Sequence, residues 1–312
     1  MDIIKFENRD EWLSLRLKDI TSTEVSALFN LNPWITEFEL WHQKKQQELV
    51  AFNENERMTW GKRLEAAIAE GFAEEYDWNV EPFKDYARIP ELRAGSSFDY
   101  RIKIEDSDFN LLEIKNVDGL QFKNKWVIEE GKVDEAPPHI ELQLQHQFLI
   151  TEYPQGFIGA LVGGNSGQAL MRKPNPAILK KITEKIEKFW WSIDNDKPPS
   201  PDFERDAEFI AELHCSSEPG LIVDASGDLE LEQLAYDYKT AGDMARDWEK
   251  KKKAAKAEIL MKIGESEKVL AEHFSISAKT TSATIVEAYE RKAFRNFRIT
   301  IKKPKQPKEQ QK

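Results

Sequence analysis

The chain has 312 residues, an apolar share of 40% and a formal net charge of −11, so it is long enough for one sizeable domain and a smaller one. The negative charge argues against a protein that coats nucleic acid without specificity, but it allows an enzyme with a local basic groove and an acidic metal site. The single cysteine, Cys215, excludes internal disulfides and cysteine-ligated metal clusters. The N-terminus has no secretory pattern and no apolar segment has the length of a membrane span, so we expect a cytoplasmic protein.

Charge and loop-forming residues divide the chain into two parts. Residues 215–312 carry 19 basic and 16 acidic side chains, whereas residues 1–214 carry 26 basic and 40 acidic ones. Loop-forming residues at 197–202 and 216–220 flank the change in charge. We therefore predict a domain over residues 1–214, an accessory domain over 215–302 and a disordered tail over 303–312.

Two short helices are predicted near the N-terminus. Residues 10–18 read as an amphipathic helix, and a second helix is expected over 20–29, where Thr21 and Glu24 have the spacing of a capping box. A helix start rich in hydroxyls beside Arg16 would suit an anion, although plain capping explains the same residues.

Two longer helices and a strand follow. The pattern predicts a helix over 34–47 and a better one over 58–75, whose apolar stripe lies beside Glu65. Residues 80–89 are expected to form one strand.

The stretch 95–115 is the most informative in the chain and reads as a β-hairpin. Asp99 lies on its first predicted strand, and Glu113 and Lys115 lie on the second. Because side chains alternate across a strand, Glu113 and Lys115 are expected on one face, with Ile114 in the core between them. Two carboxylates and an ammonium on one side of a sheet point to a metal or substrate site. A surface hairpin with ordinary cross-strand charge pairs is the alternative.

The rest of the N-terminal half predicts helix, strand and helix. A helix over 139–150 places Gln143 and Gln147 on one face, a buried strand covers 157–162, and a long amphipathic helix covers 175–194. His146 reads as an ordinary helix residue. This order predicts an α/β (α+β) core with a mixed central sheet flanked by helices.

The C-terminal part predicts a helical and β extension. Residues 228–261 read as a long charged helix, and residues 274–278 and 283–288 alternate like strands. Residues 289–298 interleave basic and aromatic side chains, which suits DNA binding and equally a half-buried amphipathic segment.

Several motifs in this order resemble the PD-(D/E)xK nuclease superfamily. They are Gly61-x-x-x-Glu65, Asp99, Glu113-Ile-Lys115 and Gln143-Leu-Gln-His. Together with Leu15-Arg-Leu-Lys-Asp-Ile-Thr-Ser-Thr-Glu-Val, they are similar to the λ-exonuclease/YqaJ group of phage recombination nucleases, over roughly residues 10–195. Two positions depart from that group, since Tyr100 and Lys18 stand where glycine is common.

The resemblance implies a restriction-endonuclease-like core and a role for each motif residue. Asp99, Glu113 and the Ile114 carbonyl would hold Mg²⁺ (or Mn²⁺), with Glu65 as a ligand of a second metal or its waters. Lys115 would act on the attacking water or on the phosphate, and Gln143 would position the water or the Lys115 side chain. The candidates for gripping a 5′-terminal phosphate are Arg16, Thr21, Thr23 and Ser97.

The resemblance also implies an activity and partners. We expect a metal-dependent 5′→3′ exonuclease that degrades one strand of linear double-stranded DNA in a bacterial host cell and exposes 3′ ends for recombination. A homo-oligomer, with a trimer favoured, and a single-strand annealing protein as partner are implied in the same way. An endonuclease or repair nuclease of the same superfamily is one alternative, and a non-catalytic DNA-end-binding scaffold is another.

Overall fold

The computed structural model describes residues 1–47, 55–104, 108–130 and 132–284. Contacts divide the chain into two units, Met1–Phe209 and Ile210–Lys312, and we describe each unit by itself. The division falls inside helix α7 (Ala207–Leu213), whereas the boundary predicted from the sequence is at 214/215. The predicted tail at 303–312, the residues 289–298 and most of the predicted strand at 283–288 lie outside the described residues.

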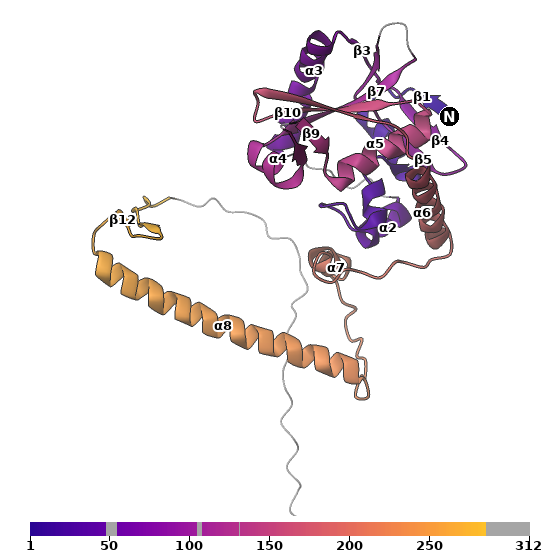
Figure 1. Ribbon diagram of the computed structural model, residues 1–312. Coiled ribbons are helices and arrows are strands. Elements are labelled where there is room, and N and C mark those ends of the chain that lie inside the picture. Colours follow the sequence, from indigo (N-terminus) through magenta and orange to yellow (C-terminus); the bar gives the residue numbers. More distant parts are fainter. Residues whose placement is uncertain (48–54, 105–107, 131, 285–312) are drawn as a thin grey trace, which may run out of the picture. The chain divides into compact units, whose positions relative to one another are not determined.

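A five-stranded mixed sheet forms the centre of the N-terminal unit (Figure 1). Its strands, in spatial order, are β11 (Ser166–Arg172), β10 (Gly156–Val162), β7 (Asn110–Val117), β6 (Tyr100–Lys103) and β3 (Asn79–Pro82). Only the β10–β7 pairing in this sheet is parallel, and the other pairings are antiparallel. Parallel neighbours need a crossover, which α5 (Pro138–Thr151) supplies. This mixed sheet with flanking helices confirms the predicted fold class.

A second, four-stranded sheet lies in the same unit. Its strands, in spatial order, are β1 (Asp2–Ile4), β4 (Tyr86–Ile89), β5 (Ala94–Ser96) and β2 (Ile20–Thr21). The prediction of one strand over 80–89 is therefore wrong. That segment contains β3 and β4, which pair in different sheets, and residues 83–85 connect them.

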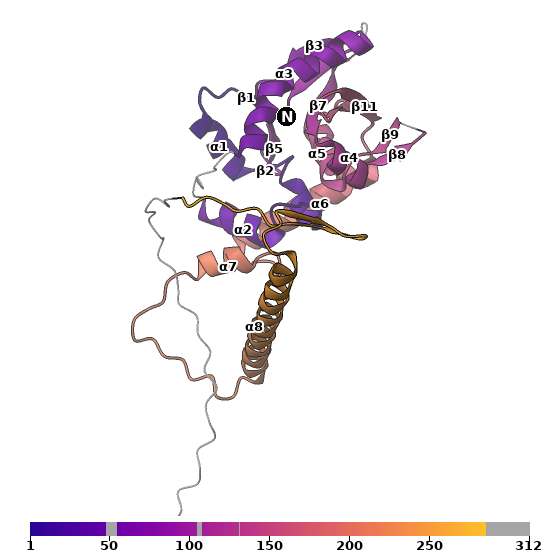
Figure 2. The same ribbon diagram turned by 90° about the vertical axis from the view of Figure 1, so that its left-hand side faces the viewer.

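Helices α3 (Glu56–Tyr76) and α5 cover opposite faces of the five-stranded sheet (Figures 1 and 2). Ile68 and Phe72 of α3 pack with Leu112 and Ile114 of β7. Leu111 of β7 points to the other face of the sheet and packs with Leu144 and Phe148 of α5. Burying such a side chain contributes ~1.5–3 kcal/mol, so the apolar alternation of β7 fixes which face each helix takes.

The smaller elements complete the N-terminal unit. They are α1 (Arg9–Lys18), α2 (Glu37–Gln46), α4 (Gly119–Lys125), α6 (Pro176–Asp194) and the hairpin of β8 (Val127–Glu129) and β9 (Lys132–Glu135). Figure 2 shows this hairpin standing out at the edge of the unit. The predicted helices at 10–18, 58–75, 139–150 and 175–194 and the strand at 157–162 are confirmed, with ends that differ by a few residues.

The predicted helix over 20–29 is wrong. Ile20 and Thr21 form β2, which pairs with β5, and only the 3₁₀ helix η1 (Val25–Phe29) follows. The Glu24 carboxylate still accepts a bond from the Thr21 peptide N–H at 3.0 Å, so half of the expected capping box forms around a turn. The predicted helix at 34–47 starts later than expected, because Thr36 caps α2 through the Glu39 peptide N–H.

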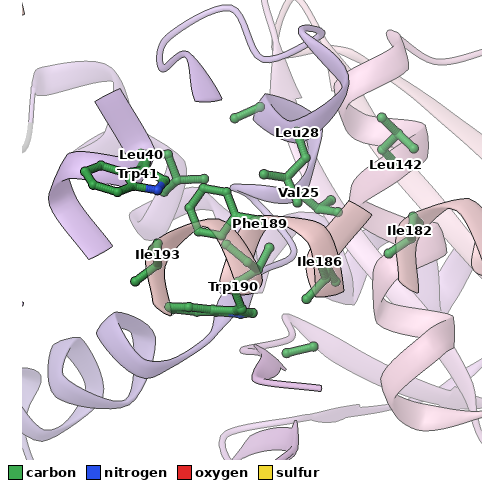
Figure 3. Close-up of a cluster of buried hydrophobic side chains, with 13 residues drawn as sticks. Val25, Leu28, Leu40, Trp41, Leu142, Ile182, Ile186, Phe189, Trp190 and Ile193 are labelled. Atoms are coloured by element: carbon green, nitrogen blue, oxygen red, sulfur yellow. The ribbon is translucent and has the colours of Figure 1, made fainter. Parts of the chain in front are cut away.

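A hydrophobic cluster holds η1, α2, α5 and α6 together, as Figure 3 shows. Val25 and Leu28 of η1 meet Leu40 of α2 and Phe189 of α6 in it. The cluster anchors the turn that carries Thr21, Thr23 and Glu24 against the crossover helix α5.

The predicted hairpin is confirmed from Tyr100 onward. Strands β6 and β7 pair antiparallel, with Tyr100 opposite Leu112. Asp99 lies before β6 and not on a strand, because β5 ends at Ser96 in the other sheet and residues 97–99 cross between the sheets.

The described residues of the C-terminal unit form the end of α7, one long helix and a small hairpin. Helix α8 (Leu229–Ile263) is followed by β12 (Lys268–Leu270) and β13 (Ser275–Ser277), which pair antiparallel. The predicted helix at 228–261 and the strand near 274–278 are confirmed. No helix in the described ranges is long and apolar enough to cross a membrane.

Candidate active site

Glu113 lies at the centre of the candidate site and is almost completely buried, with 3% of its surface exposed. It follows Leu112 on β7 and points to the face that α5 covers, because the alternation of the strand places Leu112 and Ile114 towards α3. Burial of a carboxylate is unfavourable unless donors surround it. The sequence supplies those donors from two elements.

Three N–H donors bind the Glu113 carboxylate. The Lys115 ammonium donates to Oε1 at 2.5 Å and the Gln143 amide donates to the same oxygen at 2.6 Å. The Gln147 amide donates to Oε2 at 2.7 Å. The crossover helix α5 thus fixes the rotamer of a carboxylate on the central strand.

Asp99 reaches the same place from the crossing between the sheets. Its Oδ2 accepts a bond from the Ile114 peptide N–H at 2.8 Å, which ties it to β7 between Glu113 and Lys115. Burial and the Glu113 carboxylate raise the pKa of Asp99 well above its usual value, although Lys115 acts in the opposite direction. The cluster therefore resists holding both carboxylates ionised.

Glu65 and Lys115 complete what we call the carboxylate cluster (Glu65, Asp99, Glu113 and Lys115). Burial and the Glu113 carboxylate raise the pKa of Glu65, which projects from α3. Burial alone would lower the pKa of the Lys115 ammonium, but Glu113 and Asp99 outweigh it and raise that pKa. Within this cluster three carboxylates thus surround the Lys115 ammonium, and Lys62 outside the cluster also acts to lower the pKa of Glu65.

The donor chemistry of this cluster fits a divalent cation. Carboxylate oxygens are the ligands that Mg²⁺ and Mn²⁺ prefer, and a cation would offset the excess negative charge. Within the described ranges, no set of three or more His, Cys, Asp or Glu side chains is already arranged to hold a metal ion. Both Glu113 oxygens accept hydrogen bonds from Lys115 and the glutamine amides, and Oε2, which accepts one of them, keeps a lone pair for a cation.

Hydrogen bonds and a stacking contact link three of the four predicted phosphate-binding residues into one partly exposed group. The Arg16 guanidinium donates to the Thr23 hydroxyl at 3.1 Å and stacks 4.8 Å above the ring of Trp12. The Trp12 indole N–H donates to the Ser97 hydroxyl at 2.7 Å. Thr21 differs, since it is fully buried and its hydroxyl lies 3.3 Å from that of Thr23.

A second group of polar and charged side chains lies next to this phosphate-binding group. We call it the support cluster (Asp19, Glu24, Lys44, Tyr86 and Arg88). The buried Lys44 ammonium donates to the Arg16 carbonyl at 2.7 Å, the Asp19 carbonyl at 2.8 Å and the Glu24 carboxylate at 2.8 Å. The Arg88 guanidinium and the Tyr86 hydroxyl donate to the Asp19 carboxylate at 2.6 and 3.2 Å. Lys44 thereby fixes the backbone at Arg16 and Asp19 and the side chain of Glu24.

Burial and ion pairing oppose each other in the support cluster. Burial pushes the pKa of Glu24 up, but Lys44 and Arg16 outweigh it and lower that pKa. Burial lowers the pKa of Lys44 even though Glu24 acts to raise it.

Sequence reasoning missed Gln147 as a site residue and missed the support cluster. The spacing of Gln147, four residues after Gln143 on a helix, was a usable sign, because such residues share one face. Nothing in the sequence around Lys44 sets it apart from Lys45, which is half exposed. Its burial depends on a tertiary contact with residues more than twenty positions away.

The N-terminal part is similar to known proteins. Residues 11–154 match the model of a family described as the YqaJ-like viral recombinase domain. A curated relative, the uncharacterized protein YqaJ of Bacillus subtilis (strain 168), is 28% identical over 192 residues, which is 61% of this chain and 56% of that protein. The chain thus spans just over half the length of that relative.

Two solved structures are similar to the chain. The alkaline exonuclease LHK-Exo of Laribacter hongkongensis has 17% identity and a TM-score of 0.48 over 65% of this chain and 100% of its own. The structure of LHK-Exo with dAMP has 16% identity and a TM-score of 0.49 over the same shares of both chains. The family match covers Glu65, Asp99, Glu113, Lys115 and Gln143, and residues 11–154 of the chain are similar to the YqaJ-like viral recombinase domain, in agreement with the resemblance seen in the sequence.

Proposed function

We propose that the chain is a Mg²⁺-dependent nuclease that degrades one strand of linear double-stranded DNA in the 5′→3′ direction and leaves 3′ single-stranded ends for recombination. The observation that carries this proposal is the carboxylate cluster, in which three carboxylates and one ammonium gather at the central strand. The YqaJ-like viral recombinase family of residues 11–154 supports a role in recombination.

Phosphodiester hydrolysis matches the residues of this cluster. The reaction needs an activated water and stabilisation of the leaving 3′-oxygen, and a bound divalent cation supplies both. Asp99, Glu113 and Glu65, with the Ile114 carbonyl, are our candidates to hold it. The Lys115 ammonium, fixed beside Glu113, would orient the water or stabilise negative charge on the phosphate. Gln143 and Gln147 would keep the Glu113 carboxylate in place.

Selection of DNA ends would fall to Arg16, Thr23 and Ser97. A guanidinium and two hydroxyls suit a terminal phosphate monoester, which carries more negative charge than an internal diester. Thr21 would act through the Thr23 hydroxyl, because its own side chain is buried. Ser97 stands two residues before Asp99, so a phosphate held there would lie close along the chain to the carboxylate cluster.

The proposal is tested by digesting linear and covalently closed circular duplex with Mg²⁺, comparing 5′-phosphate with 5′-hydroxyl ends. We expect loss of linear duplex only, faster with 5′-phosphate, and no loss with Glu113→Ala. Arg16→Ala should remove the preference for 5′-phosphate. Lys18→Ala, which removes an exposed positive charge from the same helix α1, is the matched control and should keep that preference.

The other outcomes separate the alternatives. Cutting of the closed circle would contradict the exonuclease and support an endonuclease. DNA-end binding without metal-dependent loss of either substrate would contradict an enzyme and support a scaffold.

A further inference from the structure

In the described part of the C-terminal unit, none of the residues of helix α8 is buried. The helix has 35 residues, with the Asp228 carboxylate capping its start through the Leu231 peptide N–H at 2.9 Å. Most helical stability in proteins comes from packing of one face. A helix of this length therefore calls for a covering surface.

One face of α8 carries an apolar stripe at heptad spacing. In steps of three and four residues it runs through Leu231, Leu234, Tyr238, Ala241, Ala245 and Trp248. The same steps then reach Lys252 and continue at Ala255 and Ile259. Leu234 and Trp248 are 58% and 63% exposed, so large apolar surface on this stripe faces solvent. Sustained heptad spacing is the pattern of a helix that pairs with another helix.

The charge of α8 changes sign along its length. Residues 229–249 carry six acidic and two basic side chains, whereas residues 250–263 carry six basic and one acidic side chain. Within the helix, Lys250 pairs with Asp247 at 3.7 Å and Lys252 with Glu249 at 3.6 Å, where the two parts meet. The ends of the helix thus have opposite charge.

We propose that α8 binds α8 of a second copy of this chain in an antiparallel two-helix coiled coil. In an antiparallel pair the acidic end of each helix lies beside the basic end of the other. A parallel pair would instead place the lysine run 250–253 of one copy beside that of the other. Charge therefore selects both the partner and its direction.

The sizes of the stripe residues agree with the antiparallel register. When the midpoint of the pair lies between Arg246 and Asp247, Trp248 of one copy faces Ala245 of the other, and Tyr238 faces Ala255. Leu234 faces Ile259 in the same register. The two aromatic residues thus meet alanines, as close packing of two helices requires, and the two aliphatic residues meet each other. A parallel pair would oppose Trp248 to Trp248.

Disulfide trapping in the full-length chain tests the direction. In a Cys215→Ser background we would introduce Leu234→Cys in one preparation and Ile259→Cys in another. Under mild oxidation, their equimolar mixture should give at least ten times more disulfide-linked dimer than either preparation alone. Met261→Cys in place of Ile259→Cys is the control, because Met261 is 86% exposed and lies off the stripe, and its yield should fall to that of the separate preparations.

Two results of that experiment would overturn the proposal. Equal cross-linking within each separate preparation would indicate a parallel pair. Absence of the mixed dimer would mean that another surface covers α8, or that it stays a single helix stabilised by its own ion pairs.

Charge exchange gives an independent test by sedimentation of the full-length chain. Changing Lys250, Lys251, Lys252 and Lys253 to Glu should weaken self-association at least tenfold, and so should changing Glu232, Asp237, Asp247 and Glu249 to Lys. The two sets combined should restore self-association, because the two ends of the helix again have opposite charge. The Asp247–Lys250 and Glu249–Lys252 pairs within each helix also persist, with their signs exchanged. Failure of the combined variant to recover, with α8 still helical by circular dichroism, would overturn the antiparallel pair.

Discussion

Two clusters of charged side chains lie inside the N-terminal unit. In one the carboxylates and cations are matched in number, and in the other the carboxylates are in excess. In the support cluster, the carboxylates of Asp19 and Glu24 face the cations of Lys44 and Arg88, with Arg16 3.6 Å from Glu24. In the carboxylate cluster, Lys115 is the cation that pairs with Glu113, while Asp99 and Glu65 add two further carboxyl groups whose pKa values are raised.

This difference distinguishes a structural network from a site. Buried carboxylates and cations in matched numbers hold chain segments together without a ligand. An excess of buried charge of one sign is a cost to the folded state, which a bound cation or substrate relieves. Four predictions test whether the two clusters behave in these ways.

The largest expected effect is that of Asp99→Asn on activity. Removing a candidate metal ligand forfeits several kcal/mol of transition-state stabilisation, so activity should fall ~10³-fold or more. Without metal the same change should stabilise the fold by ~1 kcal/mol, because a carboxyl whose pKa is raised in the folded state destabilises that state once it ionises. Nuclease assays and urea unfolding measure the two effects. A loss of stability would mean that Asp99 is a structural residue.

Lys44→Met should have the largest effect on stability. It leaves the Glu24 carboxylate buried without its main partner and frees two carbonyls, which costs ~3–5 kcal/mol. Lys45→Met, next along α2, is the matched control. Lys45 is 40% exposed and pairs with Asp196 at 3.2 Å, so we expect less than ~1 kcal/mol. Equal losses in urea unfolding would remove the distinction between buried and exposed pairs.

His146 should make the N-terminal unit sensitive to acid. Burial lowers the pKa of His146 to about 4, against the pull of the Glu24 carboxylate. The folded state therefore keeps His146 neutral while the unfolded chain takes up a proton below its usual pKa, so stability is complete above pH ~6.5 and declines as the pH falls towards 4. Between pH 7.5 and 5.0 we expect a loss of ~2 kcal/mol that His146→Leu abolishes. An unchanged slope in the variant would contradict this.

Gly95→Ala should disturb the support cluster by a steric clash. A Cβ at residue 95 would lie 2.3 Å from the Tyr86 hydroxyl and 2.6 Å from Asp19 Oδ2, and so would break their hydrogen bond. Overpacking of this kind costs ~1–3 kcal/mol. Gly71→Ala on α3 is the control, because its Cβ meets open space, and it should stabilise the helix by up to ~1 kcal/mol. Thermal unfolding of both variants gives the comparison.

Periodicity in the sequence predicted the elements that depend on it. The helices at 58–75 and 139–150 and the strand at 157–162 have apolar patterns that local geometry alone explains. The segments 20–29 and 80–89 were assigned wrongly, because their conformation is set by pairing with distant strands. Local capping residues such as Thr21 and Glu24 occur in turns as well as in helices.

The candidate site was predictable where a motif names the residue type. Asp99, Glu113, Lys115 and Gln143 were found in this way, and their contacts bring them together. The support cluster was not predictable, since the burial of Lys44 follows from how α2 packs on residues 16–24. The long helix at 228–261 was predicted, whereas its heptad stripe was not.

The parallel pairing of β7 with β10 has a consequence for when the site can first exist. Glu113 lies on β7, its amide donors arrive with α5, and the neighbouring strand β10 begins only at Gly156. A chain emerging from the ribosome carries Asp99 and Glu113 well before it carries β10, the strand that pairs with β7. Because non-local parallel pairing is a late event in folding, the carboxylate cluster would assemble only after residues up to about 162 are made. A nuclease built in this order would have no active fragment during its own synthesis.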